Sequence, residues 1–147
     1  MFNIFSKIKP RLFEIIPSDF VDIHSHILPG IDDGAKSLEE SLRLLDQIEE
    51  LGFSKIYGTP HTYPGLYDNT NETIRNSFEK LQKSYNNSIN VEFASEYMLD
   101  ESLIKKANDK TLLTIKDNFV LVEMSFISAP NHLFEIIFNI QLNGYKP

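Results

Sequence analysis

The stretch that decides the fold is Asp22-Ile23-His24-Ser25-His26-Ile27-Leu28-Pro29-Gly30-Ile31-Asp32-Asp33-Gly34. On a β-strand, side chains alternate between two faces and each residue rises about 3.3 Å, so the rings of His24 and His26 project from one face roughly 7 Å apart. Two such rings can lean together and bind one metal ion. A His-x-His pair alone is also found where two outward-facing positions of a strand are histidine and no metal is bound. The turn that follows brings the carboxylates of Asp32 and Asp33 near the strand end, which favours a metal site.

Extended and helical patterns alternate along the rest of the chain. The expected strands begin at Phe20 and cover 55–61, 90–97 and 119–126, the last with the continuous apolar character of a buried parallel strand. The expected helices cover 38–51, 71–85, 101–107 and 131–143, with caps at Ser37, Thr70 and Asp100. This alternation predicts βαβ units with right-handed crossovers, and therefore an α/β fold with a parallel sheet.

Potential metal ligands recur where the expected strands end. His24 and His26 follow the first strand, His61 the second and Glu96 the third. The carboxyl ends of parallel strands meet at one rim, so we expect these side chains to converge there. The chain contains no cysteine, so any metal is expected to be held by nitrogen and oxygen.

Length and composition exclude several classes. A chain of 147 residues is one domain, below the roughly 200 residues of a complete (β/α) barrel. A net charge of −7 without clustered Lys or Arg argues against nucleic acid as a partner. The absence of cysteine suits a reducing compartment, and no apolar run reaches the roughly 18 to 20 residues that span a bilayer, so we expect a cytoplasmic protein without stable membrane insertion.

Residues 1–18 are expected to form an N-terminal extension of a domain that covers 19–147. Phe and Ile alternate there with Lys and Arg, a pattern that can lie on an anionic membrane surface. We favour an extension that packs against the domain or frays.

The quoted motifs resemble those of a known superfamily. Asp22-Ile23-His24-Ser25-His26 with Asp32-Asp33-Gly34, then Thr59-Pro60-His61, then Ser95-Glu96-Tyr97 are similar to the first motifs of the PHP (polymerase and histidinol phosphatase) superfamily. Their order and spacing most resemble its bacterial tyrosine-protein phosphatase branch, whose manganese-dependent members are associated with capsular and exopolysaccharide synthesis. The resemblance runs from about Phe20 onward.

This resemblance implies the N-terminal part of a distorted (β/α)7 barrel with two or three metal ions at its rim. Mn²⁺ is the implied ion, with Fe or Zn as alternatives, and the implied substrate is phosphotyrosine on a tyrosine kinase of polysaccharide synthesis. Carried over by position, the implied ligands, through which the metal would act in catalysis, are His24, His26, Asp33, His61 and Glu96. His24 and His26 would share one ion, Glu96 would bridge two, and Asp33 with His61 would hold the others.

The chain also departs from the family pattern. A later histidine motif and an Asp-x-His pair, which complete the metal shell in this family, are missing, so we expect an incomplete PHP domain with impaired activity. The alternatives are a PHP phosphatase that acts on a small metabolite such as histidinol phosphate, or an inactive metal-binding or interaction fragment.

Further expectations concern six residues. Asp22 is expected to bond a histidine N–H, Asp32 to be a turn residue, and Glu123 to be a buried carboxylate or to reach the metal rim. His132 is expected to be structural or exposed. Tyr63 and Tyr67 are expected to line the substrate mouth.

Overall fold

The computed structural model describes residues 9–17, 19–86 and 88–147. The strands are β1 (Val21–Ser25), β2 (Lys55–Gly58), β3 (His61–Thr62), β4 (Asn90–Phe93), β5 (Glu96–Met98) and β6 (Leu121–Glu123). The helices are α1 (Leu12–Ile15), α2 (Leu38–Glu50), α3 (Asn71–Ser84), α4 (Ser102–Asn108), the 3₁₀ turn η1 (Lys116–Asn118) and α5 (Leu133–Leu142). None of the helices in these ranges is long and apolar enough to cross a membrane.

All strand pairs are parallel and form two three-stranded sheets, β1-β2-β4 and β3-β5-β6. The two sheets follow one register. Lys55 pairs with Asn90 in the first sheet and His61 pairs with Glu96 in the second, a constant offset of 35 residues. Backbone hydrogen bonds between the segment that links β2 to β3 and the segment that links β4 to β5 continue this ladder, such as the bond from Glu96 N to Pro60 O at 3.0 Å. The α/β class with a parallel sheet is therefore confirmed.

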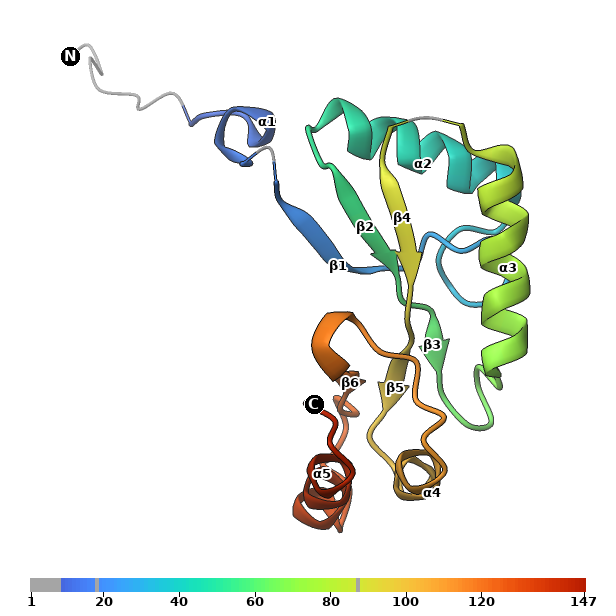
Figure 1. Ribbon diagram of the computed structural model, residues 1–147, viewed down its shortest axis with the longest axis vertical. Coiled ribbons are helices and arrows are strands. Elements are labelled where there is room, and N and C mark those ends of the chain that lie inside the picture. The colour runs from blue at the N-terminus through green and yellow to red at the C-terminus, as the bar shows by residue number, and fades with distance from the viewer. Residues whose placement is uncertain (1–8, 18, 87) are drawn as a thin grey trace, which may run out of the picture.

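Helices α2 and α3 cover one face of β1, β2 and β4 (Figure 1). Their apolar sides meet the sheet in a core that includes Leu45, Ile56, Ile74 and Leu81, each no more than 1% exposed. Thr70 caps α3 through a reciprocal hydrogen-bond pair with Thr73, as its sequence position predicts. This core fixes the ends of the strands from which the polar rim projects.

The α2 cap differs in detail from the expected capping box. Ser37 Oγ accepts from Glu40 N, but the Glu40 carboxylate accepts from Lys36 N instead of the cap backbone. Helix α4 begins at Ser102, one residue later than expected, and Ser102 N donates to Asp100 Oδ1. Both helices nevertheless form where their sequence patterns predict them.

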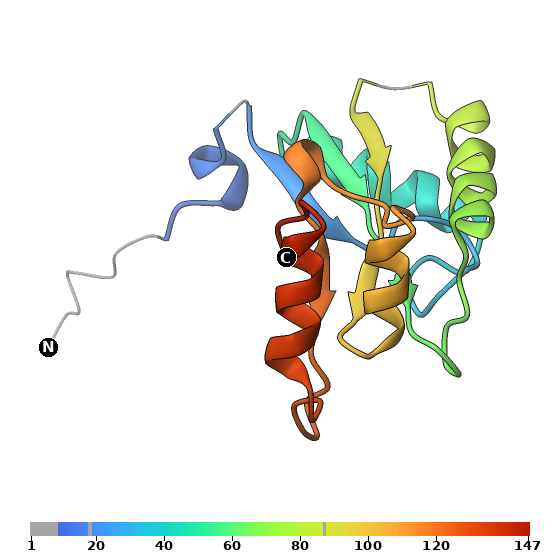
Figure 2. The same ribbon diagram turned by 60° about the horizontal axis from the view of Figure 1, so that its bottom comes forward.

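A second core lies beside β5 and β6, where α4 and α5 run side by side (Figure 2). Its large, fully buried side chains are Tyr97, Leu103, Ile136 and Ile140, each at most 1% exposed. The expected buried strand over 119–126 is wrong at both ends. The strand β6 covers only Leu121–Glu123 and pairs with β5, while Phe119 forms isolated bridges to Ile115 and Lys146.

The apolar run thus continues into an exposed loop. Phe126 is 98% exposed and Ile127 80%.

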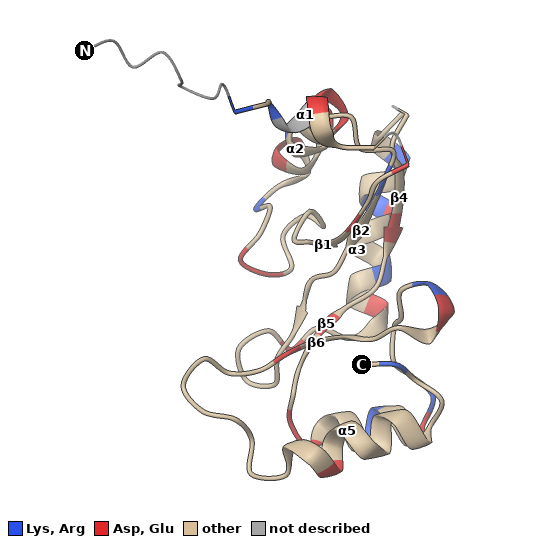
Figure 3. Ribbon diagram, turned by 90° about the vertical axis from the view of Figure 1, so that its left-hand side faces the viewer, with Lys and Arg blue, Asp and Glu red and all other residues tan. Residues whose placement is uncertain are grey.

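Helix α1 lies near the start of β1, apart from α2 and α3 (Figure 1). The proposed boundary near residue 18 stays a prediction, and residues 1–8, where Phe and Ile alternate with basic residues, lie outside the described ranges. Figure 3 shows Lys and Arg spread over several elements, with Asp and Glu among them.

Candidate metal centre

The two histidines of the first motif come together at the end of β1. Pairing between β1 and β2 is irregular between Asp22 and Ser25, and an irregularity of this kind re-aims neighbouring side chains. His26 lies one residue beyond the strand. The Nε2 atoms of His24 and His26 are 3.3 Å apart. The rings therefore lean together as the metal prediction requires.

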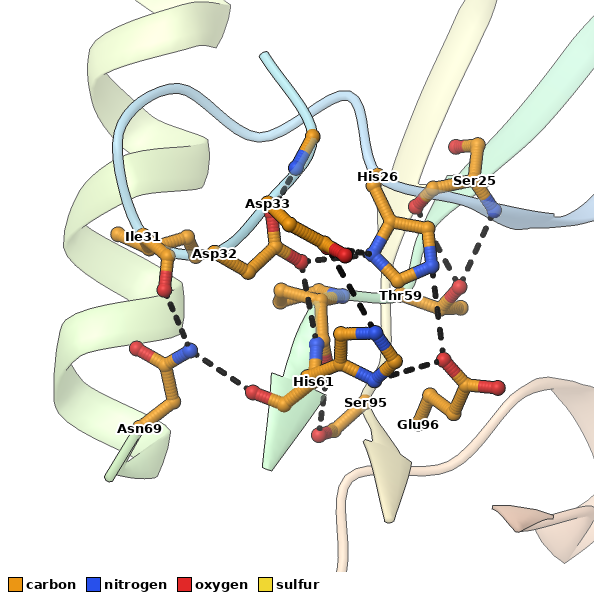
Figure 4. Close-up of polar contacts among 12 residues, drawn as sticks. Ser25, His26, Ile31, Asp32, Asp33, Thr59, His61, Asn69, Ser95 and Glu96 are labelled. Atoms are coloured by element: carbon orange, nitrogen blue, oxygen red, sulfur yellow. Dashed lines mark hydrogen bonds and ion pairs between the residues drawn. The ribbon is translucent and has the colours of Figure 1, made fainter. Parts of the chain in front are cut away.

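His61 and Glu96 occupy opposite positions at the start of β3 and β5. The Glu96 side chain is only 6% exposed, and its Oε2 lies 3.2 Å from His24 Nε2 and 3.5 Å from His26 Nε2. The same oxygen lies 3.0 Å from His61 Nδ1 (Figure 4). None of these nitrogens is aligned as a hydrogen-bond donor, so this buried oxygen has no hydrogen-bond partner among the described residues. Such an orphaned carboxylate oxygen costs free energy unless a cation or donor satisfies it.

Three overlapping groups of side chains present ligand atoms within 4.8 Å of one another. The groups are His24 with His26 and Glu96, His26 with Asp33 and His61, and His61 with Glu96 and Glu123. Imidazole nitrogen and carboxylate oxygen are suitable ligands for Mn²⁺, Fe²⁺ and Zn²⁺. The donor set therefore fits a divalent metal cluster, and all five predicted ligands lie in it.

Glu123 is a candidate ligand that the predicted set did not include. Its Oε2 lies 3.4 Å from His61 Nδ1, and its side chain is 37% exposed. Of the two expectations for this residue, the structure favours the metal rim. Glu123 is the last residue of β6, whereas Glu96 is the first residue of β5. The sequence pattern placed Glu123 inside an expected strand over 119–126, so its position at a strand end could not be read from that pattern.

Asp32 is an anchor for the two neighbouring histidines, and its assignment as a turn residue was incomplete. Its carboxylate is fully buried and accepts hydrogen bonds from His26 Nδ1 at 2.7 Å, from Gly34 N at 2.9 Å and from His61 N at 3.2 Å. With Nδ1 engaged by Asp32, His26 presents Nε2 to the cluster. Asp33 is 59% exposed, and its Oδ1 lies 3.6 Å from His61 Nε2. Asp33 therefore stays the predicted ligand of the pair.

The loop after β1 is held close to the site by backbone contacts. Ala35 N donates to His26 O at 3.0 Å, and a Cβ atom on Gly34 would lie 2.0 Å from that same carbonyl oxygen. The close approach therefore requires glycine. Asn69 Nδ2 donates to Ile31 O and to the backbone oxygen of His61, which ties this loop to the one after β3 (Figure 4).

Hydrogen bonds and nearby charges control protonation in the cluster. The hydrogen bond to Asp32, together with the Glu96 carboxylate, raises the pKa of His26 to about 10. Burial by itself raises the pKa of Asp32, but hydrogen bonds from His26 and from the Gly34 backbone outweigh burial and leave it below its usual value. Burial likewise opposes ionisation of Glu96, whose pKa is lowered overall by the neighbouring histidines. A metal ion must therefore displace a proton from His26.

The remaining expectations concern Asp22, His132 and the two tyrosines of the loop after β3. Asp22 Oδ1 accepts from a histidine N–H as expected, but from the backbone N–H of His24 at 3.1 Å and not from a ring. His132 is exposed beside Glu101 and Glu135, away from the cluster, as expected. The ring of Tyr67 stacks on His61 at 5.3 Å between centroids. Tyr63 and Tyr67 both line a pocket that reaches the cluster, in keeping with their expected position.

Comparison with known proteins assigns the family. The family model described as "Capsular polysaccharide synthesis, CpsB/CapC" matches residues 20–147. The chain belongs to the CpsB/CapC family. Its relatives include the tyrosine-protein phosphatase YwqE of Bacillus subtilis, 28% identical over 131 residues, and the putative tyrosine-protein phosphatase CapC of Staphylococcus aureus, 30% identical over 134 residues. The alignments cover 86% of this chain in both cases, and 52% of YwqE and 51% of CapC.

A solved CpsB/CapC structure has the same fold. The match has a TM-score of 0.77 at 28% identity and covers 86% of this chain and 53% of that one, from a study of YwqE and of CpsB from Streptococcus pneumoniae as "unique metal-dependent tyrosine phosphatases". The chain thus spans about half the length of the curated relatives it matches. The resemblance to the tyrosine phosphatase branch is confirmed.

Proposed function

We propose that this chain forms the metal-binding portion of a metal-dependent tyrosine-protein phosphatase that acts in capsular polysaccharide synthesis. The observation that carries the proposal is the buried Glu96 Oε2, which faces three imidazole nitrogens without a hydrogen-bond partner in the described ranges. The CpsB/CapC relatives support the reaction class, since those compared are named as tyrosine phosphatases.

Finer parts of the proposal rest on the motifs. We infer two or three Mn²⁺ ions, a distorted (β/α)7 PHP barrel as the complete fold, and a tyrosine kinase of polysaccharide synthesis as the phosphorylated partner. The cytoplasmic location stays a prediction. The observed parallel strands, with every candidate ligand at or just beyond a strand end or in the loop after β1, are compatible with such a barrel.

The side chains of the cluster would have different roles in such a site. Clustered divalent ions, when bound, lower the pKa of a water molecule and neutralise phosphoryl oxygens. His24, His26 and Glu96 would hold one ion, while His61 would join Asp33 or Glu123 at a second. Asp32 keeps the His26 ring oriented. Glu96 belongs to the group of His24 and His26 and also to the group of His61 and Glu123. The phenolate leaving group has a pKa of about 10, so it can depart without strong protonation by the protein.

The test is phosphate release from a phosphotyrosine peptide with and without Mn²⁺, alongside histidinol phosphate. We expect Mn²⁺-dependent release from the peptide, at a lower rate than a full-length relative because this chain matches only half of one. The Glu96→Gln variant should lose it. Glu135→Gln, an exposed carboxylate on α5 outside the cluster, should behave as the parent chain. No Mn²⁺-dependent release, or a preference for histidinol phosphate, would contradict the proposal.

A further inference from the structure

A pocket of about 240 Å³ lies against the candidate metal centre. One wall consists of the candidate ligands Asp33, His61 and Glu123. Most of the remaining wall is apolar or aromatic and comes from the loop after β3, from β5 and from the loop after β6, through Tyr63, Leu66, Tyr67, Met98, Phe126 and Ile127. We name these nine residues the loop pocket.

The loop that forms one side of this pocket is held in a fixed shape. Tyr63 and Tyr67 exchange two backbone hydrogen bonds of 2.9 and 2.8 Å across a tight turn, in which Gly65 has a φ of +81°. Gly65 N also donates to Asp68 Oδ1. The Tyr67 ring lies nearly parallel to the His61 ring, at an interplanar angle of 11°. The aromatic wall is therefore preorganised beside a candidate ligand.

Large apolar side chains at the pocket mouth are exposed. Leu66 is 62% exposed, Phe126 98% and Ile127 80%. Exposed apolar groups that gather around a concave, partly polar site are typical of ligand contacts. Met98, which is 8% exposed, offers a polarizable thioether, which packs favourably against aromatic rings.

The charges of the pocket fix the orientation of a ligand. Of the described residues that line it, none is Lys or Arg, while Asp33 and Glu123 are acidic. These carboxylates repel a phosphate group unless a divalent cation lies between them. A phosphorylated ligand must therefore place its phosphate at the metal wall and its organic group against the apolar wall.

We propose that the loop pocket is the subsite for the aromatic ring of the substrate, and that it selects aryl over alkyl phosphates. This inference rests on the proposed function, because it needs metal at the cluster. Leu66, Phe126 and Ile127 are the specificity-determining residues, and they act by contact with the ring. Tyr67 is excluded from the test because it also supports His61.

The experiment compares phenylphosphonate with methylphosphonate, neither of which is hydrolysed, by calorimetric titration of the Mn²⁺-loaded chain. We expect phenylphosphonate to bind about tenfold more tightly, which corresponds to about 1.4 kcal/mol. Leu66→Ala and Phe126→Ala should each reduce that preference about threefold or more and leave Mn²⁺ and methylphosphonate affinity unchanged. Leu142→Ala is the matched control, a leucine of similar exposure, 70%, on α5 outside the pocket.

Two failures can be told apart. A chain that does not bind Mn²⁺ overturns the proposed function and this subsite with it. A chain that binds Mn²⁺ but gives equal affinity for the two phosphonates, or the same preference in both pocket variants as in the parent, overturns the subsite alone.

Discussion

Replacing Asp32 with asparagine tests the role of the buried anchor. One carboxylate oxygen accepts from His26 Nδ1 and His61 N, and the other accepts from Gly34 N. An amide places an NH₂ group against one of these donors. Loss of the charge-assisted bond to His26 costs about 1.5 to 3 kcal/mol, and loss of ring orientation typically weakens metal affinity by about 10- to 100-fold.

The assay is urea unfolding of the metal-free chain together with Mn²⁺ titration. Asp32→Asn should lower the free energy of unfolding by about 2 to 3 kcal/mol and weaken Mn²⁺ binding. Asp33→Asn is the matched control, because that neighbour is 59% exposed and reaches only ring nitrogens. It should weaken Mn²⁺ binding and leave stability within about 0.5 kcal/mol. If Asp32→Asn were as stable as the parent chain, the anchoring role would be refuted.

Three further predictions concern protonation, backbone packing and metal linkage. The pKa of His26 is raised to about 10, so its pairing with Asp32 stabilises the metal-free fold fully below about pH 6.5, and this stabilisation is lost as pH rises through 10. Urea unfolding at pH 6, 8 and 10 should show the free energy of unfolding decline. The His26→Asn variant should flatten this pH dependence. Gly34→Ala should unfold or greatly destabilise the chain in thermal melts, because the added Cβ would overlap the His26 carbonyl. Gly52→Ala is the control, since Gly52 has a φ of +93° but open space around it. It should lower the free energy of unfolding by only about 1 to 2 kcal/mol. Mn²⁺ at 100 times its dissociation constant should add about 2.7 kcal/mol to the free energy of unfolding, and unchanged stability on Mn²⁺ addition, or an equal gain in Glu96→Gln, would contradict the metal assignment.

Much of the centre could be predicted because it follows from strand geometry. His24, His26, His61 and Glu96 were placed at strand ends by alternation and turn signals, and parallel strands bring such ends to one rim. The ring contacts of 3.0 to 3.5 Å around Glu96 are a consequence of that topology. Local pattern and global fold agree at these positions.

The parts that could not be predicted depend on contacts distant in sequence. Either residue of the Asp32-Asp33 pair suits a turn, and the choice of Asp32 as the buried one depends on His61 N, 29 positions away. The strand over 119–126 was overestimated, because an apolar run looks the same whether it is buried in a sheet or exposed in a loop. Phe126 and Ile127 belong to the loop, and Glu123 to the rim.

The paired segments have the same offset of 35 residues in both sheets, because the links Thr59–Pro60 and Ala94–Ser95 are equally long, and this equality constrains how chain length can vary. Consecutive strand side chains point to opposite faces. A single insertion between Gly58 and His61 would therefore turn the imidazole away from Glu96, whereas the same insertion in a surface turn beyond α3 need not disturb either ladder. We expect natural variants to gain or lose residues in the outer turns and to keep the two-residue links Thr59–Pro60 and Ala94–Ser95 at constant length.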